Sequence, residues 1–252
     1  MPTLSRTLWT DDEIAEFVQR EYPMFYPVFA AITVPVMKVD LFRYMVIYEY
    51  GGVYADMDTE CLVPVQNWLS ISGALTRAQF FHQGKLYSGR EFLTQSGRTE
   101  LVPIRCVIAV ESDTSLRGLR NYTSIQARSN QLCQWTFGCA AGHPLLQEVV
   151  TAVVRKIRST TILEFAFESV MEVTGPGIFT DSVRNYLYQS VGLAESDYDN
   201  FLGNVLSPRI FGDVLLLPQV SFREPDNSHP EWRDSVLVGI ILQVHGKYEA
   251  LL

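Results

Sequence analysis

Two aspartates separated by one residue, Asp56 and Asp58, are the pair whose type and spacing point most directly to chemistry. They follow an apolar segment, 53–55, that is predicted to be a short strand. Side chains two positions apart in an extended strand point to the same face, so the two carboxylates are expected to converge. Carboxylates at the end of a strand can hold a hard divalent cation through oxygen, and the cation can hold a diphosphate.

A second charged pair, Asp40 and Arg43, precedes the aspartates by one predicted helix. Residues 39–49 carry apolar side chains at the spacing of a buried helical stripe. Gly51 and Gly52 are predicted to end this helix, because glycine adopts positive φ without steric cost. The i, i+3 spacing places Asp40 and Arg43 on one helix face, where the residues alone allow either an ordinary surface ion pair or a functional pair.

The rest of the chain reads as alternating helices and strands. Thr10 and Glu13 form a capping-box pattern that predicts a helix over 11–21, and Pro144 suits the first position of another helix. Predicted strands are 106–110, 214–217 and 236–244. No repeat and no linker divides the 252 residues, so we expect one α/β domain. Within it, the polar stretch 70–99 is the best candidate for an insertion or a mobile loop.

Composition excludes several classes of protein. The 20 Lys and Arg against 28 Asp and Glu give a net charge of −8, which disfavours a nucleic-acid partner. Apolar runs fall short of the ~20 residues that cross a bilayer, and the first residues lack the layout of a signal peptide. The four cysteines include no C-x-x-C pair, so no structural zinc site is expected. They read as buried small hydrophobes or as one incidental disulfide.

Two runs, Lys38–Tyr44 and Tyr50–Asp58, resemble the D-x-D sugar-nucleotide signature of glycosyltransferase family 32. Further segments are similar to the same family, especially to its branch of initiation-type α-1,6-mannosyltransferases: Val107–Asp113, Cys133–Thr136, Gly142–Pro144 and Thr174–Thr180. The resemblance extends from Trp9 to Lys247. It implies a GT-A fold, a Rossmann-like α/β arrangement that binds a nucleotide-sugar and a divalent metal, manganese or magnesium.

The resemblance also implies roles for individual residues. Asp58 would bind the metal directly, and Asp56 would contact the metal or the ribose and sugar of the donor. Asp40 and Arg43 would hold the transferred sugar and its phosphate. The remaining implied contacts are Tyr54 to the donor, His245 as a further metal ligand and Lys247 to the diphosphate.

Sugar transfer in this family retains the anomeric configuration, and a bound cation would stabilise the departing diphosphate. Glu111 and Asp113, at the exit of a predicted strand, are the carboxylates expected nearest the acceptor; as residues alone they fit a helix cap or solvated loop equally. GDP-mannose is the expected donor and a glycan the expected acceptor. The alternative is a UDP-sugar, carrying glucose or N-acetylglucosamine, with a small lipophilic or natural-product acceptor. The family suggests the Golgi lumen, but the sequence also fits the cytoplasm.

Two departures from the family and two other classes complete the interpretation. One departure is the stretch 70–99, which is longer than the family leads us to expect. The family's strand with an Ile-His-Gln-x-Trp-like motif has no counterpart before Trp9, so the wall around the base is expected to be built otherwise or the chain to be shortened. The segment 56–59 also fits the nucleophile loop of haloacid-dehalogenase-like phosphatases. That reading is weak, because Asp213 precedes 214–217 without the second acid such enzymes need. A non-catalytic relic that binds nucleotide-sugars is the third reading.

Overall fold

The computed structural model describes residues 5–62, 64–65, 78–113, 126–159, 167–222 and 241–243, with only the backbone for 167–169 and 241–243. The helices in these ranges are α1 (Asp11–Glu21), α2 (Tyr26–Ala31), α3 (Pro35–Tyr50), α5 (Gly89–Ser96), α6 (Pro144–Ser159), α7 (Phe167–Val173), α8 (Pro176–Val191) and α9 (Tyr198–Leu202). Short 3-10 turns lie at Glu195–Asp197 and Gln219–Phe222. The strands are β1 (Gly52–Ala55), β2 (Thr59–Cys61), β3 (Gln79–His82), β4 (Lys85–Tyr87), β5 (Cys106–Asp113), β6 (Asn130–Leu132), β7 (Thr136–Cys139), β8 (Arg209–Phe211), β9 (Val214–Leu217) and β10 (Ile241–Gln243).

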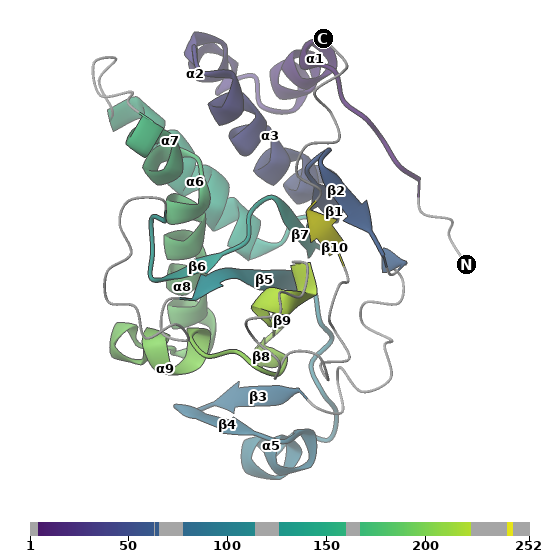
Figure 1. Cartoon of the computed structure of the whole chain (residues 1–252), viewed down its shortest axis with the longest axis vertical. Helices are drawn as coiled ribbons and strands as arrows, with labels where there is room; N and C mark the ends of the chain where they lie inside the picture. The colour runs from purple at the N-terminus through teal and green to yellow at the C-terminus, as the bar shows by residue number, and fades with distance from the viewer. Residues whose placement is uncertain are drawn as a thin grey trace.

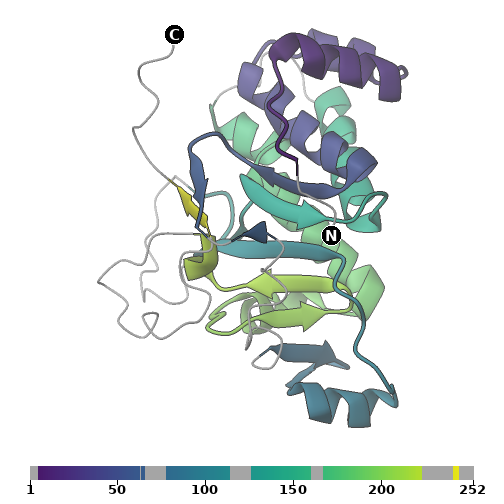
Figure 2. The ribbon, with the colours of Figure 1, turned by 90° about the vertical axis from the view of Figure 1, so that its right-hand side faces the viewer.

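A mixed sheet runs through the middle of the molecule in the order β1-β7-β5-β9-β8-β3-β4, with β6 paired to β5 (Figure 1). Strands β5 and β9 are parallel, as are β3 and β8, whereas β1 and β7 are antiparallel. A separate small ladder pairs β2 with β10. The side view in Figure 2 shows the strands of the main sheet stacked above one another, with α5 beyond the β4 edge.

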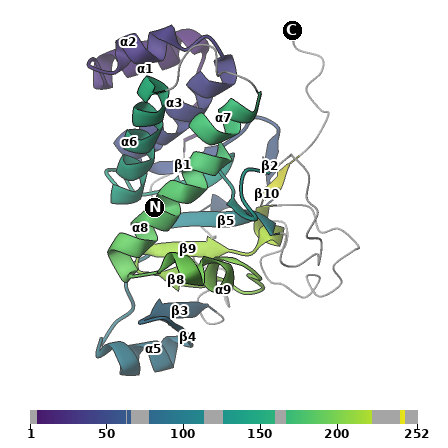
Figure 3. The same cartoon turned by 90° about the vertical axis from the view of Figure 1, so that its left-hand side faces the viewer.

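Helices α6, α7 and α8 cover one face of the sheet, and α3 lies beside them (Figure 3). Strands β5 and β9 are buried on both faces, because their alternate side chains enter two different apolar clusters. Ile108 of β5 belongs to the cluster under these helices, whereas Ala109 belongs to the cluster on the other face. The architecture confirms the prediction of a single α/β domain of GT-A, Rossmann-like type.

Most predicted elements agree with the structure. Helix α1 has the predicted bounds, and its capping box between Thr10 and Glu13 forms in both directions. Pro144 begins α6, and β9 covers the predicted 214–217. Helix α3 begins at Pro35, earlier than the predicted 39–49, because a proline in the first turn lacks only an N–H that would have no intrahelical partner.

One local prediction differs from the structure, and two others fall only partly on described residues. Asp56 and Asp58 lie in the turn between β1 and β2, not in an extended strand, so their orientation is set by the turn. Of the stretch 70–99, predicted to be an insertion or a mobile loop, residues 70–77 lie outside the described ranges, and the part from 78 onward forms β3, β4 and α5. Of the strand predicted at 236–244, the described residues 241–243 form β10.

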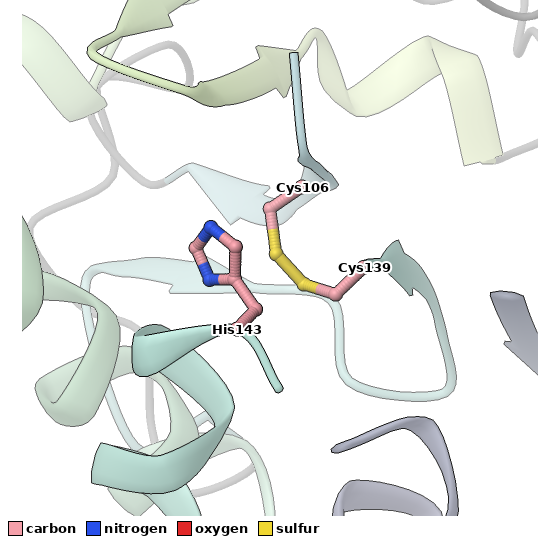
Figure 4. A group of neighbouring side chains, drawn as sticks. All are labelled: Cys106, Cys139 and His143. Carbon is pink, nitrogen blue, oxygen red and sulfur yellow. A yellow bond between two sulfur atoms is a disulfide. The ribbon is translucent and has the colours of Figure 1, made fainter. Parts of the chain in front are cut away.

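Cys106 and Cys139 form a disulfide between the adjacent strands β5 and β7, so for these two cysteines the disulfide reading is correct. His143 lies beside it at the start of α6 (Figure 4). Its Nδ1 accepts the backbone N–H of Leu145 at 3.2 Å, and its Nε2 lies 3.0 Å from Asp213. His143 therefore caps the start of α6. Among the described helices, none combines the length and the apolar character that crossing a bilayer requires.

Candidate active site

Helix α3 carries Asp40 and Arg43 into the interior. Their side chains are only 2% and 4% exposed, and Arg43 Nη2 lies 3.1 Å from Asp40 Oδ1. The reading of an ordinary surface pair is therefore wrong. Both residues fall on the stripe that also buries Leu41, Tyr44 and Ile47, so the helix has no solvated face at this level. Removing these charges from water costs free energy, so each needs close charged or polar partners. The surrounding residues supply them.

Arg43 joins helix α3 to the turn that holds the two aspartates. Its Nη2 lies 3.3 Å from Asp56 Oδ1, and its guanidinium carbon lies 4.8 Å from the centre of the Tyr54 ring. The Tyr54 hydroxyl donates a hydrogen bond of 2.8 Å to the same oxygen of Asp56. The structure therefore joins four residues that the sequence singled out separately into one connected group: Asp40, Arg43, Tyr54 and Asp56.

The backbone fixes the turn in this position. Gly51 has φ +67°, and a Cβ there would lie 2.7 Å from the backbone nitrogen of Ala141, so only glycine fits. The backbone N–H of Asp56 donates to the carbonyl oxygen of Trp135 at 2.9 Å, and the Thr59 hydroxyl donates to the carbonyl oxygen of Asp56 at 2.6 Å. The Asp56 carboxylate is 30% exposed, so it faces solvent while its backbone is held.

Glu111 reaches this group from β5. The pairing of β5 with β6 shifts between Val110 and Ser112, which leaves Glu111 as the extra residue of a β-bulge. Bulges redirect side chains and occur next to active sites. Glu111 accepts hydrogen bonds from Gln131 Nε2 at 2.8 Å and from Trp135 Nε1 at 3.2 Å. Trp135 therefore touches both Glu111 and the turn at Asp56.

Asp113, two residues after Glu111, points elsewhere. It accepts a hydrogen bond from the backbone N–H of Asn204, and its charge acts on Arg209, which binds the carbonyl oxygens of Phe201 and Gly203. These contacts belong to the α9 region beside β8. The structure thus brings Glu111 to the group around Arg43 and does not bring Asp113 there.

Burial raises the pKa of the carboxyls at this site. The pKa of Asp40 is raised by burial, against the opposing effects of Arg43 and of the Thr174 hydroxyl. Burial raises the pKa of Asp56; Arg43 and Tyr54 oppose the rise, and the charge of Asp58 adds to it. Burial likewise raises the pKa of Glu111. Each of these shifts reports a carboxyl removed from water, and the charge of Arg43 opposes the rise in every case.

Two residues at the centre of the group had no role assigned from the sequence, although both lie in segments that resemble the family. Thr174 donates from Oγ1 to Asp40 Oδ2 at 2.8 Å. Gln134 contacts both members of the Asp40 and Arg43 pair. The sequence signal that could have drawn attention to Thr174 is the glycine-rich turn that follows it. In the structure a Cβ on Gly175 would lie 2.9 Å from Met171 Cα, so this turn requires a glycine. The structure does not describe His245 and Lys247.

Comparisons with known proteins find similarity to enzymes that transfer sugars. The family described as "Glycosyltransferase sugar-binding region containing DXD motif" matches residues 1–73. The initiation-specific alpha-1,6-mannosyltransferase of Schizosaccharomyces pombe is 31% identical over 229 residues, which cover 88% of this chain and 50% of that protein. The enzyme of the same name from Candida albicans is 28% identical over 243 residues, 89% of this chain and 56% of that protein.

A more local likeness covers about a quarter of the chain. Inositol phosphoceramide mannosyltransferase 1 of Schizosaccharomyces pombe is 43% identical over 63 residues, 25% of this chain and 20% of that protein. The chain thus spans about half the length of the curated relatives that it matches along most of its own length.

Proposed function

We propose that this chain, which belongs to the DXD-motif glycosyltransferases of family 32, transfers mannose from GDP-mannose to a hydroxyl group of a glycan acceptor. The observation that carries the proposal is the bridge made by Arg43, which contacts Asp40 on one side and Asp56 on the other. It gathers the aspartate turn and the charged pair of α3 into one buried group. The transfer retains the anomeric configuration of the sugar.

The charge balance of the group supports a cationic ligand. Asp40, Asp56 and Glu111 surround Arg43, and Asp58 is close enough to raise the pKa of Asp56. Four carboxyls thus lie in or next to this group, which holds one guanidinium, so the group carries excess negative charge when all are ionised. A divalent cation would offset that excess and lower the pKa values of these carboxyls.

The residues present fit manganese or magnesium. Both ions take oxygen ligands, and the turn offers the carboxylates of Asp56 and Asp58. Oδ1 of Asp56 accepts a hydrogen bond from the Tyr54 hydroxyl and forms an ion pair with Arg43, whereas its Oδ2 makes no hydrogen bond within the described ranges. We assign Asp58 as the direct ligand, Asp56 to the metal or the donor, and His245 as a further ligand. When bound, the ion supplies charge stabilisation for the departing diphosphate.

The protein side chains position the donor. Asp40 can accept hydrogen bonds from sugar hydroxyls, and Arg43 can bind a phosphate oxygen, since its Nε is buried without a hydrogen-bond partner among the described residues. Lys247 is assigned to the diphosphate as well. Glu111, held by Trp135 and Gln131, offers a carboxylate near the carbon from which the diphosphate departs, where positive charge develops.

The test is a screen for donor hydrolysis and transfer with the purified chain. GDP-mannose, UDP-glucose and UDP-N-acetylglucosamine are each incubated with Mn²⁺ or with a chelator, with and without a mannoside acceptor. We expect Mn²⁺-dependent release of GDP and an α-linked product identified by NMR. Activity with UDP-sugars alone would replace the donor assignment. Activity that is equal in chelator would overturn the metal assignment.

The variant Asp58→Ala separates an enzyme from a binding relic. It should abolish Mn²⁺-dependent donor binding in calorimetry and also transfer, with little loss of stability, because it removes one of two close carboxylates. Asp197→Ala, in the turn before α9 and remote from this group, is the matched control and should bind donor like the wild type. If the wild type binds GDP-mannose with Mn²⁺ but neither hydrolyses nor transfers it, the relic reading is correct.

A further inference from the structure

One side chain with no assigned role holds the donor-binding pair together. Gln134 lies in the short loop between β6 and β7, and it is only partly buried. Its Oε1 accepts a hydrogen bond from Arg43 Nη1, and its Nε2 lies 3.3 Å from Asp40 Oδ1. Its backbone carbonyl oxygen also accepts from Arg43 Nη1, at 3.3 Å. One amide therefore contacts both members of the pair.

The surrounding groups permit only one orientation of this amide. The oxygen faces two donors, Arg43 and the Tyr44 hydroxyl at 3.1 Å, and the NH₂ group faces the Asp40 carboxylate. The reverse orientation would place the NH₂ against the guanidinium and the oxygen against the carboxylate. Both contacts would be repulsive, so the network itself fixes the amide.

The position of Gln134 follows from the strand register. Ala55 of β1 pairs with Thr136 of β7, which places residues 133–135 opposite the turn that begins at Asp56. The carbonyl oxygen of Trp135 accepts a hydrogen bond from the backbone N–H of Asp56 at 2.9 Å. The preceding residue, Gln134, contacts Arg43 of helix α3. The loop thus joins the aspartate turn and the Asp40–Arg43 pair through two adjacent residues.

We propose that Gln134 is a positioning residue for sugar transfer, which keeps the Asp40 carboxylate and the Arg43 guanidinium in the arrangement that receives the donor sugar and phosphate. The inference rests on the proposed function, and it assigns to this amide a task that an apolar side chain of equal length cannot perform. Without the amide, Arg43 Nη1 keeps only the backbone carbonyl oxygen of residue 134 at 3.3 Å, and Asp40 loses one of its donors. Both side chains can then take other rotamers.

Two substitutions distinguish positioning from structural support. Gln134→Met keeps the length and volume but makes no hydrogen bond, and we expect kcat/KM for GDP-mannose to fall about 100-fold through misplacement of the pair. Gln134→Glu keeps an oxygen for Arg43 and Tyr44 but places a second oxygen against Asp40. When that carboxyl is protonated, it can donate to Asp40 as the amide does.

The Gln134→Glu variant is therefore expected to depend on pH in a way that the wild type does not. The introduced carboxyl would directly face Asp40, Arg43 and Tyr44 of α3. The other titratable groups are farther away: Asp56 and Tyr54 lie on the other side of Arg43, and Glu111 of β5 lies beyond Trp135. Activity relative to wild type should rise as the pH falls and the carboxyl gains a proton. At higher pH the variant should be as defective as Gln134→Met.

The experiment measures kcat and KM with GDP-mannose and Mn²⁺ between pH 5 and 9, donor binding by calorimetry, and thermal unfolding, for wild type and both variants. Asn185→Leu is the matched control, since it removes an amide-to-carboxylate hydrogen bond of 2.7 Å to Glu148, between α8 and α6. It should keep wild-type kcat and KM.

Each outcome decides between the readings. Wild-type kcat/KM in Gln134→Met would overturn the inference, as would a Gln134→Glu variant whose activity relative to wild type does not change with pH. A wild type that binds no nucleotide-sugar with Mn²⁺ would overturn the proposed function and this inference with it. Activity with a UDP-sugar only, with the same pattern among the variants, would change the donor and support Gln134.

Discussion

The guanidinium of Arg43 lies 3.3 Å from the carboxylate of Asp56, so a single ion pair connects helix α3 to the aspartate turn. The two residues are separated in sequence by the end of a helix, a two-glycine turn and a strand. Arg43 is also held by Asp40 and covers the face of Tyr54. A change at Arg43 therefore acts on stability and on donor binding together.

The first prediction concerns this buried pair. Removing one partner leaves the other charge without compensation in a desolvated place, which costs about 3–5 kcal/mol. Arg43→Ala should therefore lower the free energy of unfolding in urea by about that amount and also lose donor binding. Calorimetry with GDP-mannose at a temperature where the variant remains folded separates the two losses.

An exposed ion pair supplies the comparison for that measurement. Arg20 and Glu21 lie 2.7 Å apart with side chains 59% and 31% exposed. Arg20→Ala should lower the free energy of unfolding far less than Arg43→Ala, since exposed pairs contribute little. An equal loss of stability in Arg20→Ala and Arg43→Ala would contradict the importance that we assign to burial.

The second prediction concerns Glu111. In Glu111→Gln one carboxylate oxygen becomes an NH₂ group that faces a donor, either Gln131 or Trp135, and the negative charge is lost. We expect kcat to fall about 100- to 1000-fold, because preorganised charge near the reacting sugar is removed. Steady-state kinetics and thermal unfolding are the measurements.

Asp113→Asn provides a contrast to that result. Asp113 contacts the Asn204 backbone rather than the Arg43 group, so the variant should lose stability more than kcat. A large fall in kcat for Asp113→Asn, with none for Glu111→Gln, would reverse the roles that their positions indicate.

Local sequence signals predicted most elements of the fold because each depends on neighbours in the chain. The capping box at Thr10, the proline that begins α6 and the glycine at position 51 each satisfy a helix end by local chemistry. The strand partners have no such signal. Strand β3 pairs with β8 across more than half of the chain, and the edge strand β4 has no apolar alternation to mark it.

The candidate site was predictable only in part, for a related reason. The spacing of Asp56, Asp58, Asp40 and Arg43 is local, and their types already suggest ligands for a cation and a phosphate. Gln134 contacts Asp40 from 94 positions away, and a single glutamine in a loop has no distinctive spacing. The burial of the Asp40–Arg43 pair also depends on helix packing, which an i, i+3 spacing does not report.

The third prediction concerns the disulfide between Cys106 and Cys139. The bridge closes a loop with a sequence separation of 33. Its loss in Cys106→Ala/Cys139→Ala should cost about 3–4 kcal/mol through the entropy of the unfolded chain. Urea unfolding should give the same loss when reductant is added to the wild type, and reductant should not affect the double variant further. Cys61→Ala, at an exposed cysteine outside this bridge, should leave stability unchanged.

The fourth prediction concerns the pH dependence of stability at Asp213. Burial alone would raise the pKa of Asp213, but the hydrogen bonds from His143 and Tyr186 outweigh it and hold the pKa below its usual value. A lowered pKa in the folded state means that the ionised group stabilises the fold above its unfolded pKa of about 3.9, and that this stability is lost as the pH falls through the lowered pKa. Asp213→Asn should therefore cost about 1–2 kcal/mol at pH 7 and progressively less below pH 4. Urea unfolding at a series of pH values measures this difference, with Glu100→Gln at an exposed position as the control. A difference that stays constant from pH 7 to pH 3 would mean that Asp213 acts through its shape and not through its charge.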